Sequence, residues 1–458
     1  MLEVVIRGGT VVSSRDLFRI DLGISEGKIA IMGNSSHFPS SDKYIDATDK
    51  LVIPGAIDTH VHFRDPGFPE REDFESGTKA AAAGGVTTVV DMPNSVPTVV
   101  EVETLRKKAE SCQKKAFTDF GLYAGAGTDA LPRIPELAKG GALAFKTLMT
   151  NYPTPGREAE FRGLHLKMDD SIIDVMEAVG GTGLTHVFHC ETDYMIRHEV
   201  ERLKSQGRND PVAHVDSRPS FAEADAIARI LILSRALDSR IHVAHMSTSE
   251  GVDLVRNEKK HRSRVSCETC VHYLLLTRKD MERLGTRAKI QPPLRDAATQ
   301  EALWGGINDG TIDNICSDHS PFTLEEKNRD IWSALPGAPD MENMIPLMLK
   351  AVNIGKLEIT KLVEISSERP AKIFQMYPRK GQLGVGADAD VTLVDMKLEK
   401  VIRAEKMQTK GRDSTIFDGV SVKGWPVLTM VRGQTVMENG KIIGSPGVGK
   451  WIVPLQNQ

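Results

Sequence analysis

Short apolar runs in the middle of the chain each end beside a residue that can bind a metal ion. Runs of about 4–8 apolar and β-branched residues predict buried strands. Five such runs cover residues 51–58, 142–145, 184–188, 241–244 and 312–317, and they lead to His60 and His62, Lys146, His189, His245 and Asp318. Polar residues placed where several strands end are typical of a site at the carboxyl face of a parallel barrel. The pattern therefore predicts both a fold and a site.

The segments between these runs predict helices. Residues 221–237 and 296–308 have helical character, and they alternate with the strands in the βαβ rhythm of a parallel sheet. Short β-like runs separated by turns fill the first fifty and the last eighty residues. We expect an α/β fold, with a (β/α)8 TIM-type barrel over residues 54–375. A small β-sandwich domain, built from residues 1–53 and 376–458, is expected beside it.

Composition narrows the class of protein. The 458 residues carry a formal net charge of −4, which gives no reason to expect a nucleic-acid partner. The chain lacks the roughly 18 consecutive apolar residues that span a bilayer, and its first residues do not have a signal-peptide profile. Five scattered cysteines favour a reduced, cytoplasmic enzyme. Since no long apolar run is present, we expect no membrane partner.

His60 and His62 are the sharpest local signal. Residues two apart on a strand point to the same face, so both imidazoles can reach one metal ion. His189, His245 and Asp318 occupy equivalent places at other strand ends, and neutral imidazole with carboxylate suits zinc and similar divalent ions. Without a metal, each of these buried polar residues needs a hydrogen-bonding explanation of its own.

Several longer motifs resemble those of the cyclic amidohydrolases, the group that comprises dihydroorotases, allantoinases and hydantoinases. The first motifs are Asp-Thr-His-Val-His-Phe-Arg-Asp-Pro-Gly at 58–67, Gly-Gly-Val-Thr-Thr at 84–88 and Asp-Met-Pro-Asn at 91–94. The resemblance continues at 145–146, 189–191, 245–247 and 317–321, and it closes with Gly-Ala-Asp-Ala-Asp at 386–390. It therefore covers essentially the whole chain.

The resemblance implies a site with two divalent metal ions, expected to be zinc. His60 and His62 would bind one ion with Asp318, His189 and His245 would bind the other, and N6-carboxylated Lys146 would bridge them. A free ammonium is repelled by two cations, whereas a carbamate offers two anionic oxygens. The implied reaction is hydrolysis of a cyclic amide in a small-molecule cyclic ureide to the carbamoyl or ureido acid by a metal-bridging hydroxide. Asp318 would be the catalytic residue that moves the proton.

The motifs leave the substrate ring open. Arg64 and Asn94 stand where dihydroorotases hold the substrate carboxylate, and a guanidinium suits that task. Alternatively, Arg64 forms an ordinary salt bridge to Asp65, Glu70 or Asp73. Against dihydroorotase, Phe322 replaces a histidine of that family, and Gln291, a further candidate for substrate binding, replaces an asparagine.

Other segments favour the hydantoinases and allantoinases, whose Cys-Glu-Ser/Thr-Cys segment resembles residues 267–270. The hydantoinase tyrosine has an uncertain counterpart in Tyr152. We therefore expect a hydantoin- or allantoin-type substrate, with dihydroorotase as the alternative, and the resemblance implies a homodimer or homotetramer. A scaffold protein without metal and a mononuclear deaminase are the competing classes. The expected metal content separates the three classes, because the hydrolase would hold about two ions per chain, the deaminase one and the scaffold protein none.

Overall fold

The computed structural model describes residues 1–150, 156–166, 170–261 and 264–455, and its centre is a parallel sheet. Within these residues the sheet has eight strands in sequence order: β8 (Ala56–Val61), β9 (Val86–Asp91), β10 (Asp119–Gly125), β11 (Ala144–Leu148), β12 (Thr185–His189), β13 (Ile241–Val243), β14 (Val265–Cys270) and β15 (Asn314–Cys316). Val61 also forms a parallel bridge with His319, so the first and last strands meet and the sheet closes. This confirms the predicted (β/α)8 barrel.

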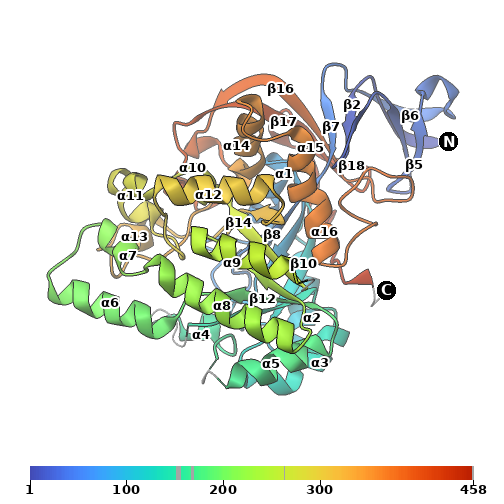
Figure 1. Ribbon diagram of the computed structural model, residues 1–458. Coiled ribbons are helices and arrows are strands. Elements are labelled where there is room, and N and C mark those ends of the chain that lie inside the picture. Colours follow the sequence, from blue (N-terminus) through green and yellow to red (C-terminus); the bar gives the residue numbers. More distant parts are fainter. Residues whose placement is uncertain (151–155, 167–169, 262–263, 456–458) are drawn as a thin grey trace.

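Helices surround the barrel (Figure 1). Those up to β13 are α1 (Phe74–Ala83), α2 (Val102–Gln113), α3 (Ile134–Lys139), α4 (Glu158–Phe161), α5 (Ser171–Gly180), α6 (Asp193–Ser205), α7 (Val212–Asp216) and α8 (Ser220–Ala236). The later ones are α9 (Ser249–Lys259), α10 (Val271–Leu275), α11 (Arg278–Leu284), α12 (Ala297–Asn308), α13 (Leu324–Lys327), α14 (Met341–Asn353), α15 (Ile359–Val363) and α16 (Arg369–Ile373). Both helices expected from the sequence are present as α8 and α12. In the described part of the chain, none of the helices has the length and apolar character required to cross a membrane.

A separate β domain lies at one side of the barrel, where Figure 1 shows blue N-terminal strands beside orange C-terminal strands. Among the described residues one sheet has the order β5 (Lys28–Gly33), β4 (Asp21–Ser25), β1 (Leu2–Arg7), β6 (Ser41–Asp46). The other has the order β19 (Lys441–Ile442), β18 (Gln434–Glu438), β17 (Ser421–Val431), β16 (Val391–Val401), β7 (Leu51–Pro54), β2 (Thr10–Val12), β3 (Leu17–Phe18). Ile6 and Leu22 share a core with Leu393 and Met430, so both ends of the chain build this domain.

A buried ion-pair network joins the two parts. Lys380 Nζ lies 2.5 Å from a carboxylate oxygen of Asp119 on β10, 3.0 Å from Asp388 and 2.6 Å from Asp390. Arg432 also pairs with Asp119. Because buried carboxylates need charge partners, these two cations account for a group of aspartates that could otherwise be taken for a metal site.

Candidate functional site

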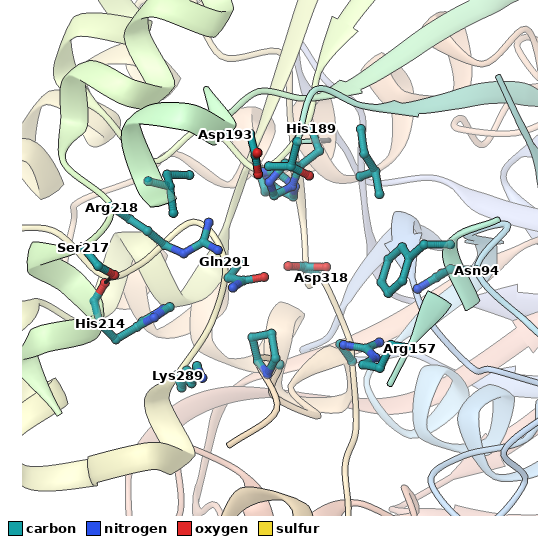
Figure 2. Close-up of a pocket in the computed structure, with 18 of the residues that line it drawn as sticks. Asn94, Arg157, His189, Asp193, His214, Ser217, Arg218, Lys289, Gln291 and Asp318 are labelled. Atoms are coloured by element: carbon teal, nitrogen blue, oxygen red, sulfur yellow. Dashed lines mark hydrogen bonds between the residues drawn. The ribbon is translucent and has the colours of Figure 1, made fainter. Parts of the chain in front are cut away.

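The six residues predicted to bind metal gather at one end of the barrel. His60, Lys146 and His189 lie within β8, β11 and β12, whereas His62, His245 and Asp318 follow the ends of β8, β13 and β15. Because the carboxyl ends of parallel strands meet at one face, the fold brings these side chains together. All six line a cavity of about 620 Å³, into which Asp318 and His189 point in Figure 2.

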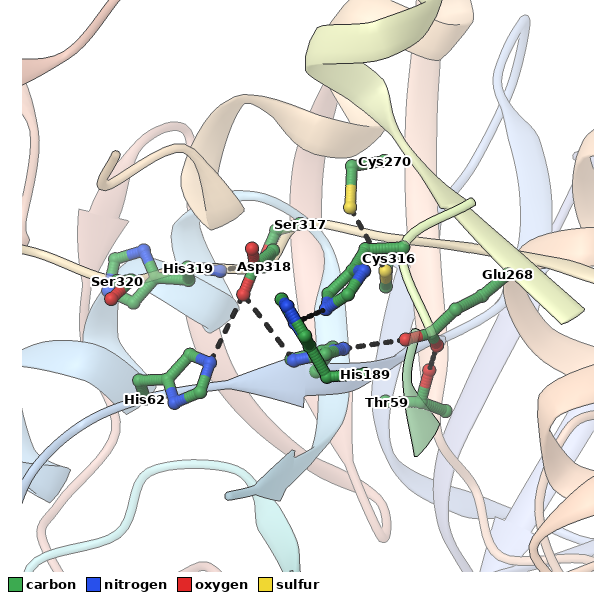
Figure 3. Close-up of polar contacts among 12 residues, drawn as sticks. Thr59, His62, His189, Glu268, Cys270, Cys316, Ser317, Asp318, His319 and Ser320 are labelled. Carbon is green, nitrogen blue, oxygen red and sulfur yellow. Dashed lines mark hydrogen bonds and ion pairs between the residues drawn. The ribbon is translucent and has the colours of Figure 1, made fainter. Parts of the chain in front are cut away.

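His60, His62 and Asp318 form the first group of converging ligand atoms. Asp318 Oδ1 lies 3.4 Å from His60 Nε2 and 3.1 Å from His62 Nε2 (Figure 3). The opposite ring nitrogens are also bound, since His60 Nδ1 lies 2.6 Å from Glu268 Oε1 and His62 Nδ1 lies 2.7 Å from Asn94 Oδ1. An Nδ1–H that donates to an oxygen leaves the Nε2 lone pair for a metal ion. Burial lowers the pKa of His60 to about 4 and that of His62 well below its usual value, so both rings are neutral.

His189 and His245 form the second group. His189 Nδ1 lies 2.9 Å from His245 Nε2, and His189 Nε2 lies 2.8 Å from Glu191 Oε2. Arg218 donates a hydrogen bond to the same carboxylate. Burial lowers the pKa of His245 well below its usual value. Glu191 therefore orients His189 as Glu268 orients His60, and the two facing ring nitrogens can share one cation.

Lys146 lines the same cavity as the two groups and differs from them in its contacts. Within the described residues its Nζ is buried and has no hydrogen-bond partner, and burial lowers its pKa. A buried amine without a partner costs free energy, so its presence in the site needs an explanation. Four imidazoles and a carboxylate fit a pair of divalent cations, and a carboxylated Lys146 would add an anionic ligand to them.

The backbone is bent at three positions of the site. Arg64, His245 and Asp318 have left-handed backbone conformations, with φ of +56°, +37° and +48°. Non-glycine residues adopt this region at a cost in free energy, and such residues cluster at functional sites. Each of these residues follows the end of a barrel strand. The left-handed conformation therefore turns the chain at the point where the side chain enters the cavity.

The three residues predicted to bind substrate all line the cavity, but their partners differ. Asn94 orients His62 through its side-chain oxygen. Arg64 donates to Glu160 Oε2 at 2.6 Å and to Ser320 Oγ at 2.8 Å. The ion-pair partner of Arg64 is therefore Glu160, and not one of the carboxylates that lie near it in the sequence. Tyr152 lies outside the described residues.

Glu160 is the centre of an arginine cluster, which we define as Arg64, Arg71 and Arg157. Glu160 accepts hydrogen bonds from Arg71 at 3.2 Å and from Arg157 at 2.8 Å, in addition to the one from Arg64. The three guanidinium carbons lie 4.8–5.2 Å from the centre of the Phe322 ring. Burial opposes ionisation of Glu160, but Arg157 and Arg64 lower its pKa to about 2. Phe322 thus provides a flat surface for these cations.

Sequence reasoning missed the carboxylates that orient the predicted residues. The sequence contained a hint for two of them. Glu191 follows the predicted ligand His189 by two positions, and Glu268 lies in a segment that resembles the hydantoinases. Glu268 also accepts a hydrogen bond from Thr59 at 2.6 Å (Figure 3). A second one comes from Asn314 at 3.2 Å. Glu160 had no signal, since it lies on the short helix α4 and contacts Arg64 across 96 positions of sequence.

Comparisons with known proteins agree with this geometry. The model of the amidohydrolase family matches residues 51–436. The solved structure of an L-hydantoinase (dihydropyrimidinase) from Arthrobacter aurescens superposes with a TM-score of 0.95 at 33% identity, covering 99% of this chain and 100% of that one. An allantoinase from Rubrobacter xylanophilus is 35% identical and a dihydroorotase from Methanosarcina mazei 34% identical, each over 99% of this chain and 98% of the relative. The resemblance seen in the sequence is confirmed, and the chain belongs to the amidohydrolase family.

Proposed function

We propose that this chain is a metal-dependent cyclic amidohydrolase that opens a hydantoin- or allantoin-type ring to the carbamoyl or ureido acid. The observation that carries the proposal is Lys146, a buried amine without a hydrogen-bond partner among the described residues, which lines the same cavity as His60, His62 and Asp318. Relatives with the names hydantoinase, allantoinase and dihydroorotase support the reaction class.

In this proposal the site holds two divalent ions, expected to be zinc. His60 and His62 would hold one ion with Asp318, and His189 and His245 would hold the other. When bound, such ions polarise a carbonyl group and lower the pKa of water. Lys146 would carry a carboxyl group on Nζ, because the carbamate is anionic and binds cations that an ammonium repels. Glu268 and Glu191 keep His60 and His189 in the tautomers that binding needs.

Asp318 is the residue proposed to move the proton. Its carboxylate contacts the imidazoles of both His60 and His62, and its side chain is 12% exposed, so it reaches both the metal ligands and the cavity. The left-handed backbone at Asp318 holds it there. It would take a proton from the attacking water and deliver it to the ring nitrogen that leaves, which makes the nitrogen a better leaving group. Gln291, with one amide donor group and one acceptor, can bind the N–H and C=O groups of a ureide ring.

The choice of ring rests on the partners of Arg64. A carboxylate attached directly to the ring, as in dihydroorotate, would meet an arginine whose two terminal nitrogens already bind Glu160 and Ser320, so an end-on bidentate pair would require the displacement of Glu160. Displacing a buried carboxylate leaves an uncompensated charge, which costs several kcal/mol, on the order of 3–5. A ring without that carboxylate leaves the arginine cluster intact. Dihydroorotase remains the alternative, because Arg64 and Asn94 both line the cavity.

The test is ring opening by the zinc-loaded protein. The substrates are dihydroorotate, dihydrouracil, allantoin and both enantiomers of a 5-substituted hydantoin, with the carbamoyl product quantified. We expect kcat/KM to be highest for a hydantoin or allantoin, and dihydrouracil to exceed dihydroorotate. Preference for dihydroorotate would establish the alternative, and a protein that opens none of these rings would contradict the proposed function.

A further inference from the structure

A buried lysine faces the cavity from the wall opposite the arginine cluster. Figure 2 shows Lys289 on one side of Asp318 and Gln291, with Asn94 and Arg157 on the other side. Lys289 is 5% exposed and lines the cavity. Its Nζ donates a hydrogen bond to the Trp332 carbonyl oxygen at 3.2 Å, and within the described part of the chain it has no ion pair. This ammonium therefore keeps donors for a ligand.

The charges around Lys289 do not neutralise it. Arg218, on the same wall, is paired with Glu191, and Lys204 lies 5.3 Å from the centre of the Trp332 ring. Burial, with these two cations nearby, lowers the pKa of Lys289 to about 7, although Asp330 opposes the effect. A desolvated cation without a carboxylate is costly, and an anionic ligand relieves that cost.

Each cation of the arginine cluster already has an internal ion pair. Glu160 pairs with all three of its guanidinium groups, and Glu326 adds a second carboxylate to Arg71 at 2.6 Å. Within the described residues, no carboxylate forms an ion pair with Lys289. Of these two walls within the described residues, the one with Lys289 therefore presents a cation without an ion pair, and a ligand carboxylate would supply that pair.

Lys289 also has a fixed relation to the proposed ring site. It precedes Gln291 by two residues and has extended backbone, with φ of −69° and ψ of 107°. Ile290 between them is 1% exposed and belongs to the hydrophobic core, so the segment alternates between core and cavity. A ring bound at Gln291 would therefore extend a substituent along the same wall towards the ammonium.

We infer that the substrate is a cyclic ureide whose exocyclic arm ends in a carboxylate, and that this carboxylate binds Lys289. The inference rests on the proposed function and deepens it, because it names the chemical class of the substituent. It also separates two kinds of acid. A carboxylate attached directly to the ring meets Arg64, which already pairs with Glu160, whereas a carboxylate on an arm meets Lys289, which has no ion pair among the described residues.

The test uses two hydantoins that differ in one functional group. They are 5-(2-carboxyethyl)hydantoin and its neutral isostere 5-(2-carbamoylethyl)hydantoin, compared by kcat/KM in the wild type and in Lys289→Met. We expect the wild type to prefer the carboxylate by about 10- to 100-fold, the range of a charged hydrogen bond. The preference should fall to within about 3-fold in Lys289→Met, because methionine keeps the length and removes the charge.

A matched control removes a cation at the rim of the same cavity. Lys204→Met makes the same charge change at an exposed residue, so it should keep most of the preference, because charges in water are screened. Lys289→Gln provides a second neutral variant if methionine disturbs folding. As a binding measurement, glutarate should raise the melting temperature of the wild type and not that of Lys289→Met.

The outcomes separate this inference from the proposed function. Ring opening of both hydantoins without a preference, or a preference that survives in both Lys289 variants, would overturn the role of Lys289 alone. A protein that opens neither ring would contradict the proposed function, and the glutarate measurement would then decide the Lys289 site by itself. Equal loss of preference in Lys204→Met and Lys289→Met would also overturn it, since it would indicate a general electrostatic effect.

Discussion

Replacing Glu160 by glutamine tests both the stability of the arginine cluster and the choice of substrate ring. Glutamine keeps the size of the side chain and removes the negative charge that Arg64 and Arg157 share. The lowering of the pKa of Glu160 from 4.5 to about 2 corresponds to about 3 kcal/mol of stability at neutral pH. We therefore expect Glu160→Gln to lower the free energy of unfolding by about this amount.

The pH dependence of this loss has a defined sign. Because the pKa of Glu160 is lower in the folded than in the unfolded protein, its contribution is complete above about pH 4.5 and disappears as the pH falls through about 2. The difference between wild type and Glu160→Gln should therefore be constant near neutral pH and shrink below pH 4.5. Urea unfolding followed by circular dichroism measures it, with Glu158→Gln as a control on the same helix, at an exposed residue.

The same variant should change substrate preference. Once Glu160 is neutral, Arg64 can bind a carboxylate attached to the ring, so the ratio of kcat/KM for dihydroorotate to that for dihydrouracil should rise about 10- to 100-fold. These two rings differ only in the carboxylate. A ratio that stays the same or falls, together with unchanged stability, would refute the argument that Glu160 occupies Arg64.

Two further predictions concern the metal site. Lys146→Ala should abolish ring opening and lower the metal content from about two ions per chain, with partial rescue by short carboxylic acids that imitate the carbamate; wild-type activity without such acids would contradict the bridged pair of metals. Glu268→Gln should weaken metal binding or lower activity by about 10- to 100-fold, because it removes the charge that orients His60. Metal analysis after dialysis measures this effect, and unchanged affinity and activity would limit Glu268 to a structural role.

The amino-acid sequence by itself determined the barrel and the residues at its carboxyl end. Strands such as β12 and β15 are short apolar runs, and His189 and Asp318 stand at the ends of such runs. This information is local, since a run of apolar residues and the polar residue after it are adjacent in the chain. The rule that parallel strands end at one face then brought distant residues together without further knowledge of the structure.

Only the tertiary structure decided the partners of those residues. Glu268 contacts His60 across 208 positions, and Glu160 contacts Arg64 across 96. No period or spacing in the sequence relates such residues, because loops and neighbouring strands bring them together during packing. The same holds for Lys289, whose burial without a carboxylate partner depends on what surrounds it among the described residues. The residues of the candidate site were therefore visible in the sequence, whereas the charged partners proposed to select the substrate became visible only in the folded protein.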